Sequence, residues 1–167
     1  PETLFFETTA EDPGHGQTKD ALAAGATLVI AAGGDGTVRV VAEALHGSDA
    51  TLALLPSGTG NLLARNLKLT LNDLDHSINS AFTGRDRAID IARIKIRREN
   101  DTVDEHSYLV MAGLGIDAKM IANTDDNLKA KAGWLAYVHA IALVFRDKDR
   151  LRFRYQLDDQ PQRNARV

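Results

Sequence analysis

Two glycine-rich turns carry the residue types in this chain that are best suited to binding a polyphosphate. The first is Gly33-Gly34-Asp35-Gly36-Thr37, and the second is Pro56-Ser57-Gly58-Thr59-Gly60-Asn61. Glycine lets a backbone come close to a ligand, and the amide groups at the start of a helix bind phosphate oxygens. Hydrogen bonds to charged groups contribute roughly 1.5–3 kcal/mol each. The two turns together predict a phosphate site.

Asp35 in the first turn indicates what chemistry such a site would do. A carboxylate beside a phosphate is repelled, by about 4 kcal/mol per pair of unit charges at 4 Å under an effective dielectric of 20. Its presence becomes favourable if it binds Mg²⁺ or accepts a proton from an attacking hydroxyl group. Both roles predict phosphoryl transfer. The alternative is a tight turn in which Asp35 only caps the following helix.

The second turn has two interpretations as well. Its hydroxyl and amide groups could hold phosphate oxygens, and Asn61 could bond ribose, phosphate or a metal-bound water. Alternatively, the turn is a plain strand-to-helix connection in which Ser57 or Thr59 caps the helix. Neither motif is a P-loop, because the pattern G-x-x-x-x-G-K-[ST] is absent. Gly113–Ala118 matches a dinucleotide pattern, but an apolar helix is expected where that fold needs a strand with an acidic end.

The elements around these turns predict an α/β fold. Residues 27–32 and 51–55 are continuous apolar runs, typical of buried strands, and each is followed by one of the turns. Helices are expected over 38–45, 62–67 and 73–82, with another that opens at Asp12-Pro13 and stops at Gly25. Leu4–Phe6 is expected to be a short strand. Alternating strands and helices predict a parallel sheet, which binds ligands at the carboxyl ends of its strands.

The character of the chain changes near Gly84. Longer strands are expected over 87–98, 107–112 and 151–157, with a helix over 128–145 and a turn over 158–161. Strands that follow one another without helices favour antiparallel pairing. We therefore expect residues 1–84 to form an α/β nucleotide-binding domain that lacks its first strand. Residues 85–167 should begin an antiparallel, β-rich lipid or substrate domain.

Composition narrows the function classes. The net charge of −3 disfavours nucleic acid as a partner. The chain has no cysteine, and no apolar run approaches the ~20 residues that span a bilayer. No secretory signal is visible, so a cytoplasmic location is expected. Basic residues alternate along 146–154, which could face anionic lipid headgroups or be the solvated face of a strand.

The paired turns resemble the catalytic domain of diacylglycerol and sphingosine kinases, including the bacterial lipid kinases. The resemblance continues through Arg87–Ile91, Gly115–Ala118 and Gly133–Tyr137, and spans Thr8 to about Phe145. It implies transfer of the γ-phosphoryl group of ATP, with Mg²⁺, to a lipid hydroxyl such as that of diacylglycerol. It also implies a lipid partner at a membrane surface, peripheral attachment, and a homodimer as one assembly.

The resemblance implies roles for particular residues. Asp35, Asp90 and Asp117 would be catalytic, with Asp35 and Asp90 also at the metal; Asp117 could instead be a helix N-cap. The nucleotide would be held by Thr9, Gly33, Gly34, Gly36, Thr37, Ser57, Gly58, Thr59 and Asn61.

Asp90 has separate support from the strand pattern. Ala88, Asp90 and Ala92 would share an apolar strand face, where a buried charge needs a partner or a metal-linked water. Alternatively, Ile89 and Ile91 point inward and a bulge near Ala92 reverses the register.

The chain also departs from the family pattern. Leu62 stands where many bacterial members have aspartate, and the opening strand with its Asn-Pro turn is not present before Leu4. We therefore expect an internal piece of a longer protein. A NAD kinase or sugar kinase that shares the first turn, and a non-catalytic nucleotide-binding fragment, remain alternatives.

Overall fold

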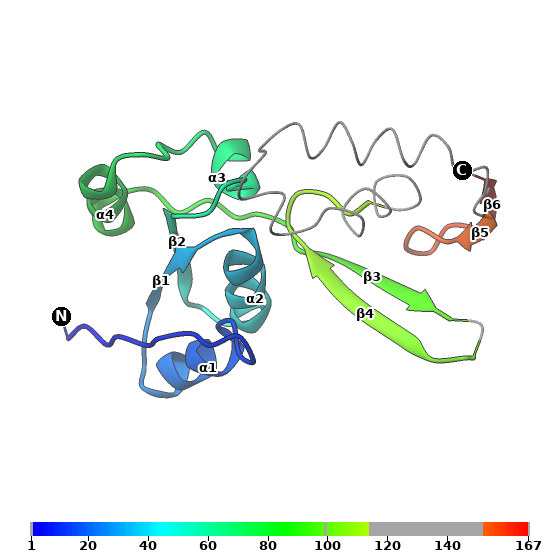
Figure 1. The fold of residues 1–167 in the computed structure, drawn as a ribbon, viewed down its shortest axis with the longest axis horizontal. Coiled ribbons are helices and arrows are strands. Elements are labelled where there is room, and N and C mark those ends of the chain that lie inside the picture. Colours follow the sequence, from blue (N-terminus) through cyan, green and yellow to red (C-terminus); the bar gives the residue numbers. More distant parts are fainter. Residues whose placement is uncertain (1, 99, 114–151, 167) are drawn as a thin grey trace. The chain divides into compact units, whose positions relative to one another are not determined.

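The computed structural model describes residues 2–98, 100–113 and 152–166. The chain divides into two compact units, 1–111 and 112–167. Figure 1 shows the elements of both units along the chain. The first unit holds a parallel strand pair with helices and an antiparallel hairpin, and the second holds another antiparallel hairpin. A mixed α/β fold is thus confirmed, whereas the domain boundary near Gly84 remains a prediction.

A parallel pair of strands sets the position of both glycine-rich turns. Strand β1 (Leu28–Gly33) pairs with β2 (Thr51–Pro56) in a register that runs from Leu28 opposite Thr51 to Gly33 opposite Pro56. The two strands therefore end at the same level. Each turn begins at the last residue of a strand, so the turns leave the sheet side by side.

Four helices belong to the same unit (Figure 1): α1 (His15–Ala23), α2 (Asp35–Leu45), α3 (Leu62–Asn66) and α4 (Leu74–Thr83). Val38, Val41 and Leu45 recur at helical spacing on α2 and pack with the sheet residues Ala31 and Leu54. This buried cluster fixes α2 against the strands, so its first turn stays where β1 ends. The expected helices 38–45, 62–67 and 73–82 are confirmed within a few residues at their ends.

Asp12 caps helix α1, as the sequence predicts. Its carboxylate accepts backbone hydrogen bonds from Gly14 (3.1 Å), His15 (2.8 Å) and Gly16 (2.9 Å). Desolvation raises the pKa of the Asp12 carboxyl, but the three amide bonds and the charge of His15 together lower it below its usual value. The helix begins at His15, so Pro13 lies before it and not at its first position.

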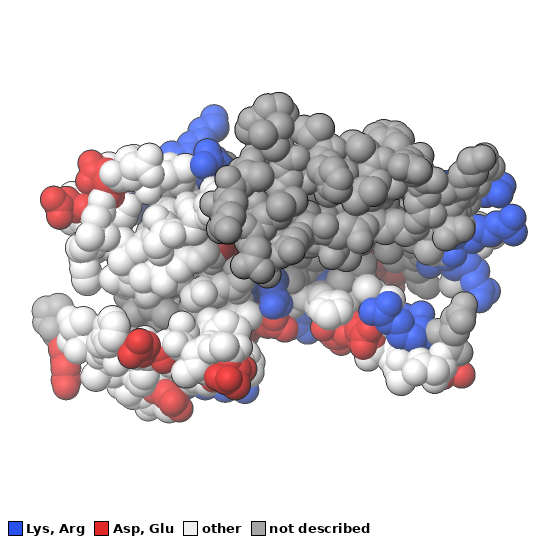
Figure 2. Space-filling view, viewed as in Figure 1, with Lys and Arg blue, Asp and Glu red and all other residues white. Residues whose placement is uncertain are grey.

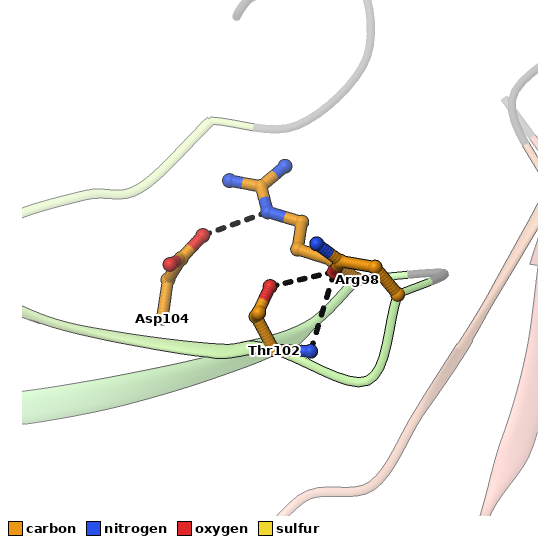
Figure 3. Close-up of polar contacts among 4 residues, drawn as sticks. Arg98, Thr102 and Asp104 are labelled. Carbon is orange, nitrogen blue, oxygen red and sulfur yellow. Dashed lines mark hydrogen bonds and ion pairs between the residues drawn. The ribbon is translucent and has the colours of Figure 1, made fainter.

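The hairpin of β3 (Ala92–Arg97) and β4 (Val103–Tyr108) is antiparallel, as expected, but β3 is shorter than the predicted range 87–98 and β4 is displaced from 107–112. Residues 87–91 are not in a strand, and β4 ends before the expected 107–112 range does. Exposed ion pairs, among them Lys95–Glu105 and Arg98–Asp104, link the two strands. Figure 3 shows one of them, from Arg98 Nε to Asp104 Oδ2 at 2.7 Å, beside the Asn100–Thr102 turn contacts.

The second unit contributes β5 (Arg152–Tyr155) and β6 (Arg163–Arg166), which pair antiparallel. The expected turn over 158–161 joins them, and the amide of Gln160 donates to the carbonyl of Leu157.

Three further expectations have different outcomes in the structure. The strand expected over Leu4–Phe6 is wrong: these residues are in no strand, and Phe5 is 89% exposed. The helix expected over 128–145 lies outside the described residues. Within the described ranges, no helix is long and apolar enough to cross a bilayer.

Candidate functional site

The two glycine-rich turns come into backbone contact. A Cβ atom added to Gly58 would lie 2.6 Å from Gly34 Cα, and the Ser57 amide donates to the Gly33 carbonyl at 3.2 Å. Neither Gly34 nor Gly58 has a positive φ. Glycine is therefore needed at Gly58 for space and not for an unusual backbone conformation. The parallel strand ends thus deliver two amide-rich turns to one place.

Asp35 joins the first turn to the second. It is the first residue of α2, which follows Gly34 as N-cap, and its Oδ1 accepts the Leu62 amide at 2.6 Å. A Cβ atom added to Gly60 would lie 2.6 Å from Asp35 Oδ2, so the carboxylate also lies directly against the second turn. Asp35 therefore does cap a helix, as one of the two interpretations of the sequence proposed. The helix that Asp35 caps is α3, however, and not its own. Asp35 remains solvent-exposed.

Asn61 shapes the second turn from within. It has a left-handed backbone with φ of 48°, and its side chain is 9% exposed. Its Oδ1 accepts the Gly58 amide at 3.0 Å, and its Nδ2 donates to the Gly58 carbonyl at 2.7 Å. The side-chain amide thus holds the turn closed, while Ser57, Gly58 and Thr59 are exposed. A direct bond from Asn61 to a ligand remains a prediction.

The loop before α1 lies beside the start of α2. Gly14 has φ of 134°, and a Cβ there would lie 3.8 Å from the methyl carbon of Thr8 and 3.9 Å from that of Thr37. Thr9 is used differently, since its Oγ1 and amide both bond the Asp12 backbone at 3.0 Å. Thr8, which sequence reasoning did not single out, therefore lies beside Gly14 together with Thr37.

Arg65 is a second residue that sequence reasoning missed. Its Nε donates to the Gly60 carbonyl at 2.6 Å from helix α3, and its side chain is exposed. The bond holds a positive guanidinium beside the second turn. A signal was present in the sequence: Arg65 is the first basic residue after that turn and lies one helical turn beyond Asn61.

The structure gives no contact between Asp90 and Asp35. The strand face expected to hold Asp90 is wrong, because β3 begins at Ala92 and Asp90 lies exposed before it. Asp90 lines a groove of about 920 Å³ that Asp35 does not line. Asp117 lies outside the described residues. The catalytic roles of Asp90 and Asp117 remain predictions.

The chemistry of the turns fits a magnesium–nucleotide complex. In the described part of the chain, no three His, Asp or Glu side chains gather to hold a metal by themselves. Mg²⁺ in nucleotide sites is usually bound through one or two carboxylates plus the substrate phosphates. The exposed carboxylate of Asp35 beside two amide-rich turns is such a donor set. The Asp35 and Asp90 metal assignments stay predictions.

Comparison with known proteins shows which family this chain resembles. A model of the diacylglycerol kinase catalytic domain matches residues 2–94, more than half of the chain. No solved structure matches the chain significantly.

Several curated proteins named "probable lipid kinase YegS-like" are similar to this chain. One from Klebsiella pneumoniae (strain 342) is 36% identical over 121 residues, which cover 71% of this chain and 38% of that protein. One from Yersinia pestis (strain Pestoides F) is 35% identical over 148 residues, which cover 83% of this chain and 46% of that protein. The chain thus spans less than half the length of these relatives. With its two converging turns and the match over residues 2–94, the chain belongs to the diacylglycerol kinase catalytic domain family.

Proposed function

We propose that the protein transfers the γ-phosphoryl group of ATP to the hydroxyl group of a lipid such as diacylglycerol. The observation that carries this proposal is the meeting of the two turns at Gly34 and Gly58. Family membership and the names of the relatives support a lipid kinase. The steps below concern what this chain's own residues would do.

The first turn would supply main-chain donors to the phosphates. The first amides of a helix have no acceptor within the helix, and α2 starts at Asp35. The amides of Gly36 and Thr37 are therefore available to an anion at the end of the sheet. The positive end of the α2 dipole adds to the attraction. Glycine at Gly33, Gly34 and Gly36 keeps side chains out of the way.

The second turn would close the cradle from the other side. Ser57, Gly58 and Thr59 are exposed, so their hydroxyl and backbone groups can reach a ligand. The Gly58 amide is already bonded to Asn61, and the Ser57 hydroxyl donates to the Leu55 carbonyl at 3.3 Å, which leaves the Thr59 hydroxyl and amide as the donors for a ligand. Thr9 is proposed at the outer phosphates, and Thr8, which lies beside Gly14 together with Thr37, is a second threonine on this side. A Mg²⁺ ion, when bound, would neutralise phosphate charge.

Asp35 would act where charge changes during transfer. Its Oδ1 is fixed by the Leu62 amide, so Oδ2 is the oxygen left to hold a metal or take the acceptor's proton. The hydrogen bond also orients the carboxylate before the substrate arrives. Asp90 and Asp117 are proposed to complete the site in the longer protein.

Arg65 would offset phosphate charge from the second turn. Its Nε donates to the Gly60 carbonyl. The two terminal nitrogens of the guanidinium carry the remaining donors, which could bond a phosphate. We assign it a positioning role for the nucleotide. The same proposal has further parts. It includes a lipid substrate, peripheral attachment at a membrane, a cytoplasmic location and a homodimer.

The test uses the full-length protein, labelled ATP, Mg²⁺ and a panel of lipid alcohols in neutral detergent micelles. Label should move to a lipid. Asp35→Asn keeps an oxygen that can accept the Leu62 amide but loses the charge, so transfer should fall by roughly 10²–10⁴-fold. Its free energy of unfolding should stay within about 0.5 kcal/mol of the wild type. Wild-type turnover by Asp35→Asn would remove this carboxylate from the chemistry.

A further inference from the structure

The β5–β6 hairpin has three arginines on one face. Arg152 and Arg154 alternate along β5, so their side chains leave the same side of the strand. Arg166 stands directly opposite Arg152, and Asn164 opposite Arg154, and directly opposed residues share a face. All four are exposed. This arginine face (Arg152, Arg154 and Arg166) therefore gathers three positive charges and includes no acidic residue.

The arginine face is not explained by the stability of the hairpin. Like charges directly opposite one another weaken a strand pair. The opposite face holds Phe153, Tyr155 and Ala165, which are half-buried, and the exposed Arg163, which stands opposite Tyr155; the two rings lie 6.0 Å apart. The aromatic side of the hairpin is thus the less exposed one, and it carries one arginine where the other face carries three. Figure 2 shows basic side chains gathered where Figure 1 draws β5 and β6.

The β3–β4 hairpin shows the same alternation with its charge compensated. Lys95 stands opposite Glu105 and pairs with it at 3.2 Å, and Arg93 reaches the same carboxylate at 3.8 Å. Arg97 pairs with Asp101 at 3.6 Å. The solvated face of a strand in this chain can thus be neutralised by acidic neighbours. Among the residues that the structure describes, no acidic side chain pairs with Arg152, Arg154 or Arg166.

We propose that the arginine face docks the protein on a bilayer of anionic phospholipid. The inference rests on the proposed function, because a lipid acceptor must be reached at a bilayer surface. Arginine matches the phosphate groups of such lipids in charge and in its fork of donors. Single-stranded nucleic acid fits less well, because it uses aromatic rings to stack bases. Here Phe153 and Tyr155 lie on the opposite face.

The test measures partitioning of the full-length protein into vesicles of phosphatidylcholine with phosphatidylglycerol. Each basic residue near an anionic surface strengthens binding by roughly fivefold. The triple variant R152Q/R154Q/R166Q should therefore bind about a hundredfold more weakly, and wild-type binding should fade in high salt. Removing opposed like charges should leave the hairpin at least as stable. If the triple variant does not fold, Arg154→Gln alone should weaken binding by about fivefold.

The matched control is R93Q/K95Q/R97Q, which removes three positive charges from the β3–β4 hairpin, where they are paired. Its loss of binding should stay below about fivefold. Equal losses in the two triple variants would show that only net charge matters and overturn the proposal. Wild-type protein that ignores the vesicles, or prefers RNA, would overturn it too. Transfer in neutral micelles is scored separately, so that failure of docking and failure of the kinase proposal can be told apart.

Discussion

Replacing Gly58 with alanine should push the two glycine-rich turns apart. The new Cβ would lie 2.6 Å from Gly34 Cα and 3.0 Å from Asn61 Oδ1. Carbon atoms in contact normally stand about 3.5–4.0 Å apart, so the turns must separate by roughly 1 Å. Overpacking of this kind costs typically 1–3 kcal/mol. We expect the free energy of unfolding of Gly58→Ala to fall by about that amount.

Nucleotide affinity should fall with stability, because both turns must reach the same phosphates. Loss of one charged hydrogen bond, worth roughly 1.5–3 kcal/mol, corresponds to about a tenfold to hundredfold weaker Kd for ATP. Urea unfolding and calorimetric titration with Mg–ATP measure the two effects.

Gly34→Ala is the matched control for the steric argument. Its Cβ would meet Gly58 Cα at 3.5 Å, which is ordinary contact. Its unfolding free energy should therefore change by less than about 1 kcal/mol. Equal unfolding free energies for Gly34→Ala and Gly58→Ala would refute the close approach of the two turns.

Three further changes test the surroundings of the site. Asn61→Ala leaves the Gly58 amide without its acceptor and should cost about 1–3 kcal/mol of unfolding free energy in urea denaturation. Asp12→Ala should lower stability at neutral pH but not in strong acid. The pKa of the Asp12 carboxyl is lower in the folded than in the unfolded state. The carboxylate therefore stabilises the fold at pH values above its unfolded-state pKa, and this stabilisation is lost as the pH falls through its folded-state pKa. Thermal melts across pH measure this loss. Arg65→Gln should raise KM for ATP more than it lowers kcat in steady-state assays, and an unchanged KM would contradict its positioning role.

The parts of the fold that follow local pattern could be predicted from the sequence. The strands before both turns and the helices after them were expected within a few residues. The apolar runs form β1 and β2, although only Ala31 and Leu54 in them are buried, and Gly25 and Gly47 follow their helices with φ of 86° and 84°. The sequence also predicted that the two turns form one site, because the carboxyl ends of parallel strands lie at the same edge of a sheet.

The parts that failed depend on partners far along the chain. Leu4–Phe6 has strand composition but is in no sheet in the described structure, and a strand needs hydrogen-bond partners. The bounds of β4 follow its pairing with β3, in which Lys95 stands opposite Glu105, and the pattern of one strand does not give its register against another. Asp90 was placed on a strand face because its segment alternates, yet pairing starts only at Ala92.

The site's internal contacts could not be predicted for the same reason. The bond from Asp35 to the Leu62 amide spans 27 residues, and the Arg65–Gly60 bond depends on how α3 leaves the turn. The sequence indicated which residues could touch phosphate. It did not indicate that Asp35 and Asn61 would also hold the turns in shape.

Amide hydrogen exchange with and without Mg–ATP tests the convergence of the two turns most directly. If one anion is held between them, the amides of Gly36, Thr37 and Thr59 should gain protection together and with the same nucleotide dependence. Protection confined to one turn, or none at either, would contradict the account.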